Sequence, residues 1–88
     1  MKWKISFSAS SLEFIGKEKI TEEDVVGVVK KTILKFQGED SNVDVKKLRG
    51  KWTGFYRIRI GKLRIISEFN FDNPSAFIEK IDWRGKVY

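Results

Sequence analysis

Two segments of alternating side chains flank the dipeptide Gly61-Lys62, and this pattern constrains the fold more than any other in the sequence. Residues 55–60 and 63–71 are rich in aromatic and β-branched side chains, which is typical of strands. A glycine in the first position of a two-residue loop is typical of a type II′ hairpin turn. The sequence therefore predicts an antiparallel hairpin in which Arg59 lies opposite Arg64.

This register sorts the hairpin side chains onto two faces, because successive residues of a strand point to opposite sides. The apolar face holds Ile58, Ile60, Leu63, Ile65 and Phe69, and the charged face holds Arg57, Arg59, Arg64 and Glu68. Like charges directly opposite one another are destabilising, so the paired arginines indicate a clamp for a phosphate. The alternative is a solvated strand face, on which arginine stems cover the sheet and Glu68 neutralises Arg59 or Arg64.

The chain before the hairpin predicts one strand and two helices. Residues 3–7 alternate between apolar and polar side chains, as in a half-buried strand. Ser10-Ser11-Leu12-Glu13 matches a capping box and predicts a short helix. A longer helix is predicted from Thr21, because three acidic residues follow it directly and lysines lie toward the other end. The expected buried face of this helix consists of Val26, Val29, Ile33 and Phe36.

Loops and one more strand account for the other segments. Residues 37–42 form a polar loop, and residues 45–52 form a basic connector without a clear period. Asp72-Asn73-Pro74-Ser75 predicts a turn, since proline cannot continue a strand ladder, and a third strand follows at residues 76–83.

The register of that third strand stays open. Phe77, Ile81 and Trp83 share one parity, whereas Ile78 has the other. A bulge or an odd turn length therefore decides which of its faces meets the core.

The order β-α-α-β-β-β predicts an α+β fold, with two N-terminal helices packed on a small, mostly antiparallel twisted sheet. At 88 residues the chain has room for one hydrophobic core. We therefore expect a single domain over residues 1–88.

Composition excludes several kinds of chemistry. The chain contains neither cysteine nor histidine, so the usual zinc ligand sets and the catalytic constellations built on those residues are absent. We expect no cofactor and no metal. No run of 18 apolar residues occurs, and the start Met1-Lys2-Trp3-Lys4 lacks the apolar core of a secretory signal. The sequence thus predicts a cytoplasmic protein with no membrane partner.

The net charge of +6 is concentrated in the second half of the chain. Residues 1–44 contain seven basic and eight acidic residues, whereas residues 45–88 contain eleven and four. A basic region of this kind favours a polyanion such as RNA or DNA as the partner. The alternative is a lysine-rich surface that only maintains solubility.

Four short motifs follow one another between residues 47 and 88. They are Lys47-Leu48-Arg49-Gly50, Tyr56-Arg57-Ile58-Arg59-Ile60, Gly61-Lys62-Leu63-Arg64-Ile65-Ile66 and Arg84-Gly85-Lys86-Val87-Tyr88. In this order and spacing, after a strand and two helices, they resemble the core signature of the RelE/ParE toxin superfamily. That resemblance implies the fold predicted above.

The resemblance also implies an activity. Toxins of the RelE branch cleave messenger RNA in the ribosomal A site, through attack of a ribose 2′-oxygen on the neighbouring phosphate. Arg57 and Arg59 match the two basic strand residues of that branch, and Arg64 matches the arginine that holds the scissile phosphate. Arg84 matches the residue assigned to protonation of the leaving group, and Tyr88 matches a tyrosine that orients or stacks on a nucleotide. Planar guanidinium groups suit this chemistry, because they stabilise the extra charge of a phosphorane-like transition state.

One departure concerns the general base. Arg59 stands where some relatives have lysine, and arginine stays protonated in proteins, which makes it a poor base. Proton abstraction would then fall to Glu68, Lys62, Lys80 or water. Glu68 is the first candidate because it shares the face of the arginines, and the alternative is that it only balances their charge.

Substrate binding is expected in the basic segment before the hairpin and near the end of the chain. If the resemblance holds, Lys47, Arg49 and Lys51 contact the backbone of ribosomal RNA, together with the neighbouring lysine at position 46. Lys86 belongs to the same binding set. The aromatic side chains Trp52 and Trp83 either stack on nucleotides or pack inside the protein.

The resemblance implies a cognate antitoxin protein as partner, besides messenger RNA and ribosomal RNA. Two other functions stay open: inhibition of DNA gyrase, as in the ParE branch, and binding of RNA or antitoxin without catalysis. Arg64, Arg84 and Tyr88 together favour the nuclease branch.

Overall fold

The computed structural model describes residues 2–83, which form two α-helices, one short 3-10 helix and five strands. In chain order the elements are β1 (Lys4–Phe7), α1 (Ala9–Lys17), α2 (Glu22–Phe36), β2 (Asp44–Lys47), η1 (Gly50–Trp52), β3 (Phe55–Ile60), β4 (Leu63–Asn70) and β5 (Ser75–Trp83). The predicted α+β class is confirmed.

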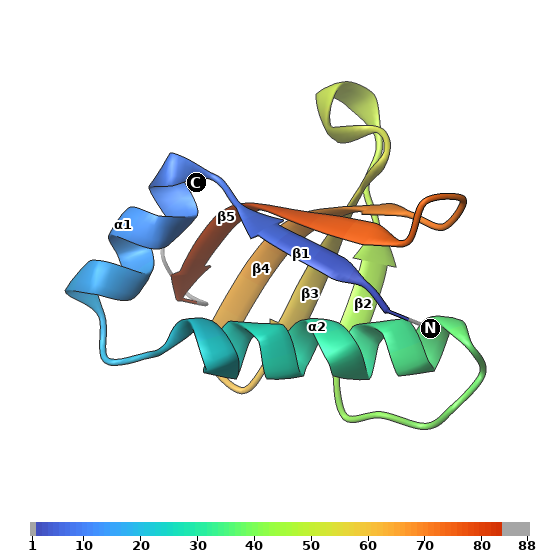
Figure 1. Ribbon diagram of the computed structural model, residues 1–88, viewed down its shortest axis with the longest axis horizontal. Helices are drawn as coiled ribbons and strands as arrows, with labels where there is room; N and C mark the ends of the chain where they lie inside the picture. The colour runs from blue at the N-terminus through green and yellow to red at the C-terminus, as the bar shows by residue number, and fades with distance from the viewer. Residues whose placement is uncertain (1, 84–88) are drawn as a thin grey trace.

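The strands form one sheet in the order β1-β5-β4-β3-β2. β1 runs parallel to β5, and the other neighbours are antiparallel. α2 crosses one face of this sheet, and α1 lies beside β5 at one end of the molecule (Figure 1). Both helices bury side chains against the same core, so the opposite sheet face carries no helix of the described chain. We call that opposite surface the open face.

The β3–β4 hairpin has the predicted register. Ile60 pairs with Leu63 and Arg59 pairs with Arg64 across the turn. Gly61 has φ 56°, and no other type of residue in the described chain has a positive φ. Lys62 therefore has a negative φ, and this combination is that of a type II′ turn.

α2 begins where the sequence predicted, whereas α1 begins earlier. The side chain of Thr21 accepts a hydrogen bond from the Asp24 amide, and Asp24 accepts one from the Thr21 amide, which completes a capping box. For α1 the prediction of a cap at Ser10 was wrong. Ser8 is the N-cap, and its hydroxyl accepts a hydrogen bond from the Ser11 amide at 3.1 Å.

A strand lies where the sequence predicted part of a basic connector. β2 pairs with β3 along its whole length, with Val45 opposite the fully buried Ile58. The segment lacks a hydrophobic period because β2 is an edge strand, and only Val45 reaches the core cluster from it. Pairing with the hairpin, not local propensity, makes this segment a strand.

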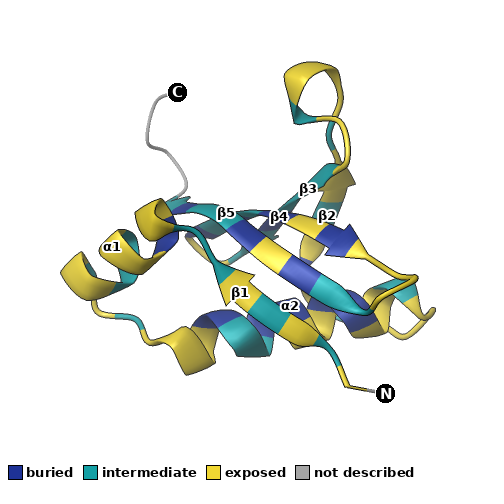
Figure 2. Cartoon of the chain, turned by 45° about the horizontal axis from the view of Figure 1, so that its top comes forward, coloured by how far each residue is buried: buried dark blue, intermediate teal, exposed yellow. Residues whose placement is uncertain are grey.

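A β-bulge settles the parity of β5. Ile66 of β4 pairs with Lys80, but the next residue, Ser67, pairs with Ile78, so Glu79 is the extra residue. Before the bulge Ala76 and Ile78 face the core, and after it Ile81 does. The alternation of buried and exposed positions along β5 is visible in Figure 2.

Serine hydroxyls bind the backbone of the bulge. Ser8 Oγ donates to the Glu79 carbonyl at 2.7 Å, and the buried Ser11 Oγ donates to the Ile78 carbonyl at 2.9 Å. From β4, Ser67 Oγ donates to the Phe77 carbonyl at 3.1 Å. The bonds from Ser8 and Ser11 tie the start of α1 to the irregular part of the sheet, and the bond from Ser67 joins β4 to β5 there.

The hydrophobic core lies between α2 and the sheet. Its fully buried members include Val25 and Val29 of α2 and Ile58, Ile65 and Ile78 of the strands. Of the buried face predicted for α2, Val29 and Ile33 are buried and Phe36 is half-buried against the core, whereas Val26 is half-buried outside the core cluster.

Two neighbouring isoleucines test this division of the sheet. Ile65 is fully buried in the core, whereas Ile66 lies half-buried on the open face. We expect Ile65→Ala to lower the free energy of unfolding by about 2–5 kcal/mol, because it leaves a cavity, and Ile66→Ala to lower it by less than half as much. Urea denaturation of both variants measures the difference, and equal losses would contradict the assigned faces.

Candidate functional site

Three rows of side chains cross the open face, one beneath the other. Each row contains one residue from each of four neighbouring strands, and successive rows lie about 7 Å apart along the strands. The clamp row consists of Asp44, Arg59, Arg64 and Asp82. The basic row consists of Lys46, Arg57, Ile66 and Lys80. The aromatic row consists of Phe55, Glu68, Phe77 and Ser6.

The clamp row brings the two opposed arginines together as predicted, but each has a carboxylate on its outer side. Arg59 donates to Asp44 Oδ2 from Nη2 at 2.9 Å and from Nε at 3.3 Å. Arg57, from the basic row, reaches the same oxygen at 3.2 Å. On the other side, Arg64 Nε donates to Asp82 Oδ1 at 3.2 Å. The two carboxylates offset the repulsion between the opposed arginines.

The two ion pairs differ in their exposure. The side chains of Arg64 and Asp82 are each 17% exposed, whereas Asp44 is 59% exposed. The hydrogen bond from Arg59, with the nearby positive charges of Arg57, Arg59 and Lys35, holds the pKa of Asp44 below its ordinary value of 3.8, although desolvation acts in the opposite direction. Asp44 is therefore ionised at neutral pH.

Formal charge is distributed unequally between the rows. The clamp row has two arginines and two aspartates, so it is neutral, whereas the basic row adds three cationic side chains and no acid. A polyanion that lies across the open face thus meets an excess of positive charge in the basic row and paired guanidinium groups in the clamp row.

Glu68 does not lie beside Arg59 or Arg64. It belongs to the aromatic row, between Phe55 and Phe77, four residues along β4 from Arg64 and hence about 13 Å away. Among residues 2–83, Glu68 takes part in no ion pair. The alternative that Glu68 neutralises Arg59 or Arg64 was wrong, since Asp44 and Asp82 do so.

Neither aspartate was a candidate from the sequence. The position of Asp44 opposite Arg59 depends on β2, and the sequence of β2 lacks the alternating apolar pattern that predicts a strand. The place of Asp82 opposite Arg64 depends on the bulge at Glu79, because an unbroken alternation from Ile78 would turn Asp82 toward the core.

The predicted substrate-binding residues before the hairpin lie at one end of the sheet. The segment between β2 and β3 projects beyond the strands (yellow-green in Figure 1), and it exposes Arg49 and Lys51. Trp52 is half-buried, with its ring 5.5 Å from that of Phe55. Lys47 is exposed but has the parity of Val45, so Lys46, not Lys47, shares the open face with Arg57.

Trp83 packs inside the protein. Its ring lies 5.6 Å from that of Phe14, and its Nε1 donates to Glu18 at 2.6 Å. The packing alternative for Trp83 is thereby confirmed. Arg84, Lys86 and Tyr88 lie outside the described residues.

The described residues offer neither a metal site nor a membrane-spanning helix. Within residues 2–83, no three acidic side chains gather in a way that would hold a metal ion. No helix in that range combines the length and the apolar character needed to cross a bilayer.

Comparison with known proteins finds similarity in structure only. No protein-family model matches the sequence, and no curated protein matches it significantly. Among solved structures, a chain of the RelE–RelB complex from the archaeon Pyrococcus horikoshii has a TM-score of 0.64 and 23% identity, over 99% of this chain and all of that one. The chain has the RelE-like fold.

Other structures agree with this assignment. The RelBE2 toxin–antitoxin complex of Mycobacterium tuberculosis gives a TM-score of 0.62 at 19% identity, over 96% of this chain and 100% of that one. A metal-bound toxin from Helicobacter pylori gives 0.71 at 13% identity, over 99% and 100%. The fold expected from the sequence motifs is therefore confirmed, and at these identities the likeness is one of fold.

The ion pairs of Asp44 predict a dependence of stability on pH. Because its folded pKa lies below 3.8, ionised Asp44 stabilises the fold above that pH, and this contribution is lost as the pH falls through the folded pKa. Asp44→Asn lacks the contribution, so its unfolding free energy should differ from that of the wild type most at neutral pH and progressively less below pH 3.8.

Chemical denaturation from pH 7 down to acid measures this difference. Asp40→Asn is the matched control, since Asp40 is exposed and takes part in none of the ion pairs among residues 2–83. A difference between wild type and Asp44→Asn that stays constant across the acid range would contradict the role of these ion pairs.

Proposed function

We propose that this protein is the toxin of a toxin–antitoxin system and cleaves messenger RNA on the ribosome. The observation that favours this function most is the pair of opposed arginines in the clamp row, on a sheet face that the helices leave open. The fold supports it, since the similar solved structures include toxin–antitoxin complexes. We place the activity in the cytoplasm, where the ribosomes are.

The chemistry is transesterification within the RNA chain. A ribose 2′-oxygen loses its proton and attacks the adjacent phosphorus, and the 5′-oxygen leaves with a proton, giving a 2′,3′-cyclic phosphate and a 5′-hydroxyl. Arg59 and Arg64 stabilise the additional negative charge on the phosphoryl oxygens. Arg84, by its resemblance to the family pattern, donates the proton to the leaving oxygen, and Tyr88 positions a nucleotide.

The carboxylates of the clamp row hold the arginines before a phosphate binds. Asp44 accepts hydrogen bonds from Arg59, and Asp82 accepts one from Arg64. The arginines therefore keep an ordered position before the substrate arrives, which lowers the cost of arranging them in the transition state.

The proton acceptor lies near the clamp row. Glu68, the first candidate from the sequence, is about 13 Å along the strand from Arg64, beyond hydrogen-bond reach of a hydroxyl held there. Asp82, Lys80 and water are the acceptors close enough to Arg64 to take its place.

Basic residues outside the clamp row bind the ribosome. Lys46, Lys47, Arg49 and Lys51 are exposed at the end of the sheet and contact the ribosomal RNA backbone, with Lys86 as a further contact. A cognate antitoxin covers or distorts the same basic surface.

Cell-free translation of a defined messenger tests the cleavage. We expect 5′ ends that appear only with ribosomes, and we expect Arg64→Ala to reduce cleavage by about 100-fold or more, because it removes a donor to the transition-state charge. Primer extension maps the ends. Lys31→Ala, on the exposed surface of α2, is the matched control and should cleave normally.

An intact messenger would overturn the proposed cleavage. In that case a supercoiling assay with DNA gyrase distinguishes the ParE-like function, which gives inhibition, from a role in binding alone, which gives none.

Growth inhibition tests the same site in cells. Expression of the wild type should arrest growth, Arg64→Ala and Arg84→Ala should abolish the arrest, and Tyr88→Ala should impair it less. Each variant must accumulate as folded protein, which circular dichroism of the purified chains checks. Arrest that survives both arginine changes would exclude the proposed mechanism.

A further inference from the structure

Phe77 is an apolar side chain on the open face that the core does not use. It is 36% exposed, although its neighbours Ala76 and Ile78 are buried at 2% and 0% and β5 is an interior strand. Among residues 2–83, the Phe77 ring takes part in no contact with another aromatic ring. Exposed apolar side chains are common on proteins, so the ring alone indicates no site.

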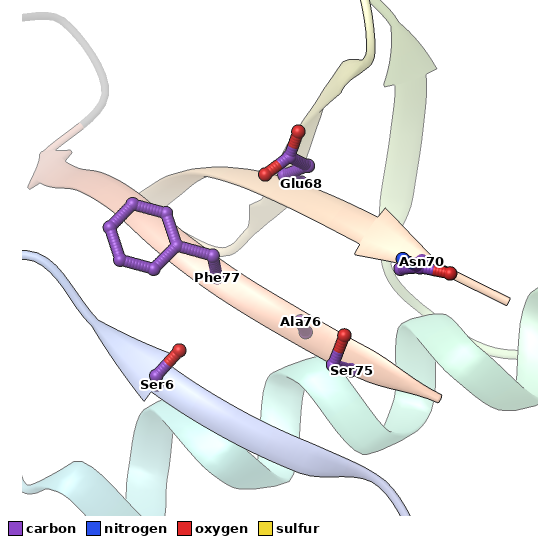
Figure 3. A pocket seen from close by; sticks show the side chains of 6 residues that line it. All are labelled: Ser6, Glu68, Asn70, Ser75, Ala76 and Phe77. Carbon is purple, nitrogen blue, oxygen red and sulfur yellow. The ribbon is translucent and has the colours of Figure 1, made fainter. Parts of the chain in front are cut away.

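A small hollow lies beside this ring. Ser6, Glu68, Asn70, Ser75, Ala76 and Phe77 line it, and Figure 3 shows how these side chains are arranged on three neighbouring strands. Its volume is about 60 Å³, the space of about two water molecules, so it accepts the edge of a ligand and not a whole ring. A ligand ring would have to lie outside the hollow, against Phe77.

The polar groups of the hollow are not equivalent. Asn70 Oδ1 accepts hydrogen bonds from the amides of Asp72 and Asn73 at 3.0 and 3.1 Å, so its oxygen is engaged in the turn. Glu68 is exposed and, within residues 2–83, makes no ion pair. Besides the hydroxyls of Ser6 and Ser75, its carboxylate is thus the charged acceptor that the hollow presents to a ligand.

Charge indicates which part of an RNA lies here. The basic row, with Lys46, Arg57 and Lys80, separates the hollow from the clamp row and attracts phosphates. The carboxylate of Glu68 repels phosphates, so a nucleotide that reaches the hollow must turn its base toward it. Unpaired bases stack on aromatic side chains of open sheets and present their edges to polar groups.

We infer that Phe77 and Glu68 form a subsite for an unpaired guanine of the RNA, an assignment that rests on the proposed function. The base stacks on the exposed Phe77 ring, and the Glu68 carboxylate accepts hydrogen bonds from its Watson–Crick edge. Guanine presents two adjacent N–H donors on that edge, which match two carboxylate oxygens. The same edges of adenine, cytosine and uracil place an acceptor next to a donor, so each pairs with the carboxylate less well.

Binding, separated from cleavage, tests the subsite. The probes are fluorescent hexauridylates with a 2′-O-methyl group on every ribose, which prevents attack by the 2′-oxygen, and one guanine placed at each position in turn. Fluorescence anisotropy with the full chain gives the affinity of each probe relative to the all-uridine one. We expect one guanine position to bind about tenfold more tightly than uridine, a gain typical of one bidentate base contact.

Substitutions of Glu68 and of Phe77 should change RNA binding in different ways. Glu68→Gln should abolish the preference for guanine, although the loss of a negative charge raises the affinity for every probe. Phe77→Ala should weaken the guanine probe about tenfold, and Phe77→Trp should restore its binding, because stacking needs only an aromatic face. The matched controls are Glu22→Gln and Leu34→Ala, two exposed residues of α2, which should keep the guanine preference.

The outcomes separate this inference from the proposed function. A guanine preference that depends on both residues supports the subsite even if the ribosome assay shows no cleavage. Equal binding of all probes, or a preference unchanged in both variants, overturns the subsite and leaves the cleavage assay as it was. A Glu68→Gln variant with an unchanged base preference also overturns it, whatever its rate of cleavage.

Discussion

The two-residue turn at Gly61-Lys62 is the constraint on which the rest of the structure depends. Its positive φ at Gly61 is easy for glycine and strained for other residues, and it sets the register of β3 against β4. Because side chains alternate, a slip of one residue would move the isoleucines of the core to the open face and the arginines into the core. The turn therefore fixes the hydrophobic core and the clamp row at once.

Opposed arginines need charge partners, and the sheet supplies them from its flanking strands. Asp44 of β2 and Asp82 of β5 each accept hydrogen bonds from one of the arginines, so the clamp row is neutral before any ligand binds. The same pairs hold the guanidinium groups in position. The folded protein thus accommodates two opposed arginines, which in the proposed function bind a phosphate.

The bulge at Glu79 links the helices, the core and the open face. Its carbonyl groups accept hydrogen bonds from Ser8 and Ser11 at the start of α1, so the irregular backbone is satisfied. By shifting the parity of β5, it lets Ile78 and Ile81 share the core. Asp82 and Lys80 consequently point to the open face, and the bulge is as necessary for the candidate site as for the packing.

The sequence by itself determined the features that depend on neighbours along the chain. The hairpin register follows from a two-residue turn, and the start of α2 at Thr21 follows from the acidic residues directly after it, so both depend on local interactions. Only the tertiary structure decided the partners of the arginines, the strand β2 and the position of Glu68 beside Phe77. Those features depend on strands that pair across long separations and on one extra residue in β5, which no local pattern specifies.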